Sequence, residues 1–106
     1  MIINYETFRK LYAEAKEQEN LEMYQFERGW EDWMDGASGN EIMAFLETVH
    51  KIARGGFPEL LEQYKNLRAM SECLEIPYST LQKWKQEISS PTDHLLKLMA
   101  YATVNK

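Results

Sequence analysis

The sequence predicts an all-α protein, a compact bundle of about six to seven short helices, from three observations. Apolar residues recur three and four positions apart along most of the 106-residue chain, which is the spacing of one helix face. No five-residue window alternates apolar and polar residues as a half-buried strand does, and β-branched residues are sparse. Capping residues, glycines and prolines then mark where one helix ends and the next begins.

The first two expected helices follow from apolar spacing and one cap. A helix over residues 4–18 would bury one face, and Asn20 is placed to cap a second helix that carries Leu21 and Tyr24. Gly29 is expected to interrupt this second helix. The apolar positions of the first helix are Tyr5, Phe8, Leu11, Tyr12 and Ala15, and helical spacing resumes after Gly29 at Trp30, Trp33 and Met34.

The clearest loop, residues 35–40, precedes a third helix. Ser38 and Glu41 fit a capping box, with Asn40 as the rival cap. Gly55-Gly56 is expected to end the helix and to separate an acidic helical subdomain, residues 1–56, from a second domain, residues 57–106. Because the break is short, the two should pack together. The apolar face of this third helix comprises Ile42, Phe45, Leu46, Val49 and Ala53.

Four more helices are expected after residue 56. Phe57-Pro58 opens the first, since proline suits a first helical turn, and a second covers about residues 67–74. The turn at residues 75–77 leads to a helix over 78–86, and a last helix begins with Ser90 as cap, Pro91 in the first position and Asp93 in the first turn. The expected buried residues are Leu60, Leu61, Tyr64 and Leu67 in the first of these helices; Leu67, Met70, Ser71 and Leu74 in the second; and Leu95, Leu98, Met99 and Ala102 in the last.

Composition limits the class of protein. The longest apolar runs are only a few residues, which argues against a membrane span, and residues 1–6 lack the basic and apolar stretches of a signal peptide. Cys73 is the single cysteine, so no intrachain disulfide forms, and we expect a cytoplasmic protein. The net charge is −5, and residues 1–56 hold 11 acids and 6 bases, whereas residues 57–106 hold 6 of each. The excess of acid therefore lies in the first half.

The stretch from Ile76 to Trp84 is the most informative in the chain. Pro77 pushes Ile76 out of the helical region, so the preceding helix must already have ended. Leu81 and Trp84, three apart, would face inward, and the polar residues between them outward. Exposed glutamine and lysine on such a helix suit a DNA major groove, because glutamine can bind adenine bidentately and lysine can reach guanine or a phosphate.

Residues 57–101 resemble the helix-turn-helix domain of the Xre/Cro-like repressor superfamily, as found in small bacterial, prophage and mobile-element proteins. There, a helix bearing alanine and glutamate leads to a turn ending Ile-Pro, an aromatic residue, Arg/Ser-Thr-Leu-Gln-x-Trp, a Ser/Pro loop and a Leu-rich helix. The corresponding stretches here are Met70 to Trp84 (MSECLEIPYSTLQKW), Ser90-Pro91 and Leu95-Leu96-Lys97-Leu98-Met99. Two positions depart from the pattern: Glu75 stands where the turn usually has glycine, and Gln86-Glu87 stands where a glycine commonly follows the helix. Residues 1–56 match no family pattern.

The resemblance implies sequence-specific binding to double-stranded DNA, as a small transcriptional regulator of a phage or mobile element. The helix over 67–74 would cross the DNA backbone, the helix over 78–86 would enter the major groove, and a homodimer would read two half-sites about one turn apart. It implies no cofactor, no small-molecule substrate and no catalysis. The expected DNA-binding residues are Tyr78, Ser79, Gln82 and Lys83 near base edges, Arg68, Thr80 and Lys85 near phosphates, and Gln86 at the end of the helix.

The acidic first half supports an alternative function. Its expected protein-binding surface comprises Glu27, Trp30, Glu31, Asp32 and Asp35. A phage or mobile-element inhibitor of a host nuclease, of the anti-CRISPR type, would use such a surface to compete for a basic nucleic-acid channel, with the helix-turn-helix as scaffold. No nucleophile, histidine or glycine-rich loop accompanies these carboxylates, so neither catalysis nor a metal site is expected. His50 and His94 stand singly on helices, as surface or hydrogen-bonded groups.

Overall fold

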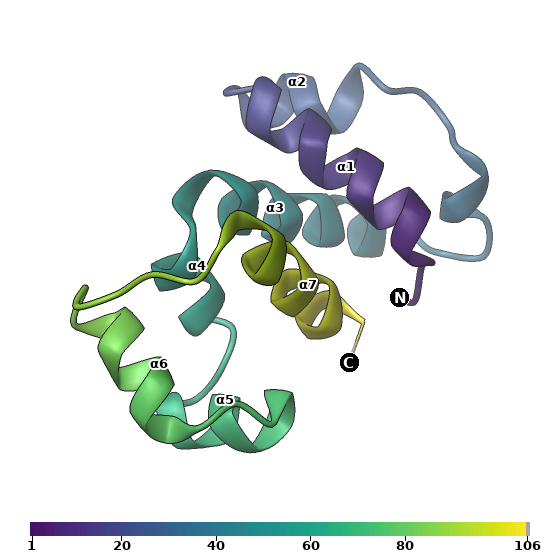
Figure 1. The fold of residues 1–106 in the computed structure, drawn as a ribbon. Helices are drawn as coiled ribbons and strands as arrows, with labels where there is room; N and C mark the ends of the chain where they lie inside the picture. Colours follow the sequence, from purple (N-terminus) through teal and green to yellow (C-terminus); the bar gives the residue numbers. More distant parts are fainter. Residues whose placement is uncertain (106) are drawn as a thin grey trace.

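The computed structural model describes residues 1–105, and within them the protein is all-helical, which confirms the predicted fold class. Seven α-helices and one 3-10 turn follow one another without a strand in this described part. Figure 1 shows α1 and α2 at one end of the molecule and α5 and α6 at the other. The elements are α1 (Tyr5–Glu17), α2 (Leu21–Phe26), η1 (Asp32–Met34), α3 (Gly39–Gly55), α4 (Phe57–Leu61), α5 (Leu67–Leu74), α6 (Tyr78–Lys85) and α7 (Asp93–Val104).

Side-chain caps set the start of most helices. Asn20 accepts a hydrogen bond from the Met23 N–H at 3.0 Å, and Ser38 accepts one from the Glu41 N–H at 3.2 Å, as predicted. The rival cap, Asn40, instead lies inside α3. Three further caps open α1, α5 and α7, namely Asn4, Asn66 and Thr92.

The central helix is α3, against which α1, α2, α4 and α7 pack (Figure 1). Its predicted apolar face is confirmed, because all five residues are buried together with Ile52. Gly56 has φ 75°, a value that only glycine adopts readily, and it ends α3 and turns the chain into α4. Because α7 returns to pack on both α3 and α1, one core runs through both halves of the chain.

The N-terminal segment is bonded to the end of α7. The Ile3 N–H donates to Asn105 Oδ1 at 2.8 Å, and the Tyr101 hydroxyl donates to the Ile3 carbonyl at 3.0 Å. Tyr101 also stacks edge-on against Tyr5, with ring centroids 5.3 Å apart. These contacts join residues about a hundred positions apart and fix α7 beside the first turn of α1.

The helical spacing of Trp30, Trp33 and Met34 corresponds to a single short turn and not to a full helix. The segment forms only the short turn η1, between Gly29 at φ 69° and Gly36 at φ 84°. A single turn directs few side chains inward, so Met34 is buried, Trp33 is half-buried and Trp30 is exposed.

The beginning and the face of the last helix also differ from the prediction. Thr92, and not Ser90, caps α7 by accepting from the Leu95 N–H at 3.1 Å, so Pro91 precedes the helix. The buried face then consists of Met99, Ala100 and Thr103, while the expected core residues Leu98 and Ala102 are exposed. Packing on both α3 and α1 fixes this rotation, which the spacing of leucines alone does not reveal.

The helix that begins at Phe57 is shorter than expected. It ends at Leu61, and Tyr64 lies in the following turn. Tyr64 still faces the interior, where its hydroxyl lies 2.7 Å from Thr103 Oγ1. Thr103 Oγ1 also donates to the Met99 carbonyl at 2.7 Å, so the threonine hydroxyl lies between Tyr64 and the backbone of α7.

Candidate nucleic-acid interface

The turn between α5 and α6 is closed by hydrogen bonds from both sides. The Ser71 hydroxyl donates to the Ile76 carbonyl at 2.6 Å, and the Ile76 N–H donates back to the Ser71 carbonyl at 3.3 Å. Between them Glu75 is left-handed, with φ 55° and ψ 41°, the conformation for which glycine is usual. The turn therefore has the expected position and shape, with a residue that adopts it at some cost.

Two residues fix α6 against the rest of the protein. Leu81 is completely buried, and Trp84 is half-buried with its ring edge-on to Phe57, centroids 5.7 Å apart. Phe57 belongs to α4, so α6 is anchored through α4 to the central helix α3. This is the inward face that the sequence predicted for Leu81 and Trp84.

The opposite face of α6 gathers four of the predicted DNA-binding residues. Ser79, Gln82, Lys83 and Gln86 are all exposed. Their spacing of three, four and seven places them on one side of the helix, opposite Leu81 and Trp84. The structure thus presents one hydroxyl, two amides and one ammonium group together on a helix whose other side is anchored.

The other four predicted residues lie around this face. Tyr78 is 42% exposed, and the Arg68 guanidinium of α5 lies 5.7 Å from its ring centroid, a cation–π distance. Tyr78 and Lys85 line a groove of about 880 Å³ between α4, α6 and the start of α7. Thr80 lies on the inner side of α6 and is half-buried.

The charge on this region is modestly positive on α6 and mixed around it. The helix carries Lys83 and Lys85 and no acid, whereas Glu72, Glu75 and Glu87 stand on α5, in the turn and after α6. Among the described residues no side chain caps α6, and the Thr80 and Leu81 N–H groups donate to the Pro77 carbonyl, which leaves the Tyr78 and Ser79 N–H groups for an external acceptor such as a phosphate oxygen.

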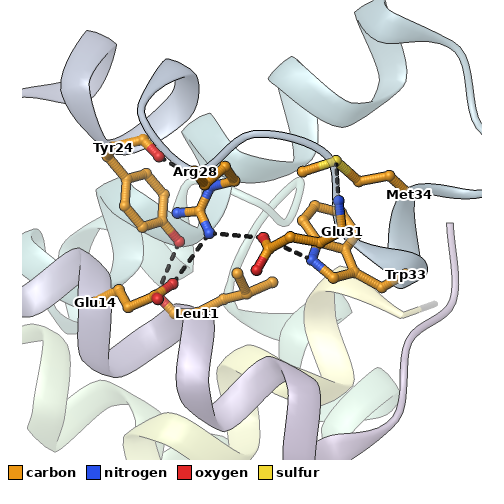
Figure 2. A network of polar contacts seen from close by, with 7 residues as sticks. All are labelled: Leu11, Glu14, Tyr24, Arg28, Glu31, Trp33 and Met34. Atoms are coloured by element: carbon orange, nitrogen blue, oxygen red, sulfur yellow. Dashed lines mark hydrogen bonds and ion pairs between the residues drawn. The ribbon is translucent and has the colours of Figure 1, made fainter.

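The acidic surface at the other end of the molecule is organised by a residue that the sequence analysis did not single out. The Arg28 side chain is only 8% exposed, and its Nη1 lies 3.0 Å from Glu14 and 3.0 Å from Glu31 (Figure 2). Its Nε donates to the Tyr24 carbonyl at 3.0 Å, and its guanidinium lies 4.5 Å from the Tyr24 ring centroid. An arginine inside an acidic run was the available signal.

Several predicted protein-binding residues are engaged by this network or near it. Glu31 also accepts from Trp33 Nε1 at 3.1 Å, so its carboxylate is directed toward Arg28 and Trp33 (Figure 2). Asp35 accepts from Trp30 Nε1 at 2.9 Å, while Glu27 and Asp32 are exposed. The five residues therefore lie in one region, but the Glu31 carboxylate already contacts Arg28 and Trp33, and the Trp30 indole is hydrogen-bonded to Asp35.

Burial alters the pKa of both central residues of this network. Desolvation would lower the pKa of Arg28, but its hydrogen bonds to Glu31 and Glu14 outweigh that effect and raise the pKa overall. For Tyr24 the effect of burial has the opposite sign: burial raises the pKa of its hydroxyl, although the positive charge of nearby Arg28 opposes the increase. The Tyr24 hydroxyl donates to the Leu11 carbonyl at 2.8 Å, so Tyr24 remains neutral and Arg28 remains charged at ordinary pH.

Few other groups in residues 1–105 are candidates for binding a ligand or taking part in a reaction. Within residues 1–105 no three His, Cys, Asp or Glu side chains are grouped so as to hold a metal ion. No helix in that range has both the length and the apolar character to cross a bilayer. His50 is buried, with Nε2 2.8 Å from the Gln18 carbonyl, and Cys73 is exposed.

No protein-family model, curated protein or solved structure matches this chain. The resemblance to Xre/Cro-like domains therefore stays a prediction based on residues 57–101.

Proposed function

We propose that this protein binds double-stranded DNA sequence-specifically by placing α6 in the major groove, as a small transcriptional regulator of a phage or mobile element. The observation that supports it best is the outward face of α6, on which Ser79, Gln82, Lys83 and Gln86 stand together. Leu81 and Trp84 hold the opposite side, so these polar groups keep a fixed orientation relative to the domain.

Each group on this face has a defined role in the proposal. Gln82 would pair bidentately with adenine, and Lys83 would reach guanine or a phosphate. Arg68 and Lys85, on either side, would contact phosphates and set the register of α6 along the duplex. The uncapped start of α6 adds N–H donors for one further phosphate.

The small number of cations predicts a modest dependence on salt. Arg68, Lys83 and Lys85 would neutralise roughly three phosphates per chain, which corresponds to about a 40-fold loss of affinity between 50 and 200 mM salt. A dimer with roughly six contacts would lose about 2,000-fold over the same range. The salt slope therefore reports how many chains bind each site.

The test is selection from a pool of random duplex DNA at several salt concentrations, followed by sequencing of the retained fraction. We expect an enriched motif, and we expect Lys83→Glu to abolish its binding. Lys10→Glu is the matched control, because it makes the same charge change at an exposed position on α1. The proposal fails if no motif is enriched at the lowest salt, or if Lys10→Glu weakens binding as much as Lys83→Glu does.

A further inference from the structure

Three large apolar side chains are exposed in the stretch of chain from residue 23 to residue 30, which includes α2 at the end of the molecule opposite α6 (Figure 1). Phe26 is 68% exposed, Trp30 is 65% exposed and Met23 is 44% exposed. Met23 and Phe26 lie three apart on α2, and Trp30 follows in the next loop. We call these three residues the apolar patch. Such exposure of two aromatic rings in one short stretch is typical of surfaces that bind another molecule.

The apolar patch is held in place by the hydrogen bonds around it. Trp30 Nε1 donates to Asp35 at 2.9 Å, which fixes the indole while leaving most of it in solvent. On the α2 side, Arg28 binds the Tyr24 carbonyl and bridges to Glu14 and Glu31 (Figure 2). These bonds restrain the loop that carries Trp30, which reduces the conformational freedom that this loop loses on binding.

The stretch of chain that carries the apolar patch is strongly acidic. Residues 17–50 contain nine acids and a single base, Arg28. Arg28 is only 8% exposed and already bonds two carboxylates, so it offers no positive charge to a partner. Glu22, Glu27, Asp32 and Asp35 are exposed beside the apolar patch. Aromatic faces and carboxylates together fit guanidinium and ammonium groups, which stack on tryptophan and pair with acids.

We propose that the apolar patch and its acidic border bind a basic segment of a partner protein, one that carries arginine or lysine next to an apolar residue. A nucleic acid is disfavoured at this end because its phosphates would face unpaired carboxylates. A second copy in a symmetric dimer would place the same carboxylates against each other. This site is separate from α6 and does not depend on the proposed DNA binding.

The test uses a library of random twelve-residue peptides displayed on phage and selected against the full chain. Enriched peptides are then synthesised with a fluorescent label, and their Kd is measured by anisotropy at two salt concentrations. We expect the selected peptides to be basic, with an apolar residue beside arginine or lysine, and to bind at least tenfold more weakly to Trp30→Ala and to Phe26→Ala. Glu27→Gln should weaken binding about threefold.

Ile88→Ala is the matched control, because Ile88 is 68% exposed at the other end of the molecule and should leave peptide binding unchanged. Circular dichroism confirms that each variant is folded. The proposal is overturned if no peptide is enriched, if the enriched peptides are neutral or acidic, or if Ile88→Ala weakens them as much as Trp30→Ala does. Sedimentation showing a dimer that Trp30→Ala dissociates would also overturn it. DNA affinity should be the same for Trp30→Ala and the native chain, so a failure here is distinct from a failure of the α6 proposal.

Discussion

Replacing Arg28 with methionine is expected to lower the free energy of unfolding by about 2–3 kcal/mol. The Arg28 side chain is 8% exposed and contacts Glu14, Glu31 and the Tyr24 backbone and ring. Methionine keeps most of the apolar stem while it removes the charge and every hydrogen bond. The change therefore measures what the polar network contributes, with little change in packing.

The magnitude follows from the contacts one at a time. The two ion pairs contribute least, about 0.5–1 kcal/mol together, because the Glu14 and Glu31 side chains are 54% and 37% exposed and water can solvate them afterwards. The hydrogen bond from Nε to the Tyr24 carbonyl contributes about 1 kcal/mol, and the contact of the guanidinium with the Tyr24 ring about 0.5–1 kcal/mol. For a domain of this size, the resulting loss lowers Tm by about 10 °C or more.

The assay is urea unfolding followed by circular dichroism, with Arg9→Met as the matched control. Arg9 is exposed on α1, so its replacement should change the stability by less than about 0.5 kcal/mol. Glu31→Gln should also cost less in the Arg28→Met background than in the native chain, because the pair is already broken. The reasoning is refuted if Arg28→Met is as stable as the native chain, or if Arg9→Met loses as much.

Three further predictions concern single positions. Glu75→Gly should raise the free energy of unfolding by up to about 1 kcal/mol, since glycine adopts φ 55° freely; a lower urea midpoint than native would contradict this. Thr92→Ala should lower it by about 1 kcal/mol while Ser90→Ala leaves it unchanged, and equal losses in urea titrations would show that Thr92 is not the cap of α7. Tyr12→Phe should stabilise the protein by about 1 kcal/mol, because the Tyr12 hydroxyl is buried without a partner among the described residues. Burial, with a smaller contribution from Asp93, also raises the pKa of Tyr12 from 10 to about 12. Tyr12 therefore ionises first in the unfolded chain, and this residue alone lowers stability by about 1 kcal/mol per pH unit between pH 10 and 12, in addition to the fall that Tyr24 causes. Tyr12→Phe should reduce that slope, and an unchanged slope in alkaline urea titrations would argue against it.

The sequence was most informative where local chemistry decides the structure. The helices expected over residues 67–74 and 78–86 occur at Leu67–Leu74 and Tyr78–Lys85. Pro77 and the apolar pair Leu81 and Trp84 were enough to place the second of them. Glu75 stands where the turn usually has glycine, and it adopts the positive φ of that position.

Local sequence patterns gave wrong predictions where contacts between residues distant in sequence determine which side chains are buried. Leucines of the last helix predicted a face containing Leu98, but packing against α1 and α3 selects the face with Met99 and Ala100. Trp30, Trp33 and Met34 have helical spacing, yet only the short turn η1 forms there, between Gly29 and Gly36.

The two candidate sites also differ in whether local sequence patterns predict them. The polar face of α6 could be read from its spacing, and all four of its residues are exposed. The Arg28 network joins residues from α1 and the loop after α2, which no local pattern connects. The function of each surface, and the domain boundary at residue 56, stay predictions.

The hydrogen bonds between Ile3 and the end of α7 affect when this protein can fold during its synthesis. Helices α1 and α3 are synthesised early, but the core between them is not fully buried until α7 has left the ribosome and packs against both helices. We therefore expect nascent chains that stop before residue 93 to remain open and accessible to protease. The same proximity of residues 3 and 105 means that a short linker between them, with new ends in the loop near residue 36, should give a circularly permuted protein with the native fold.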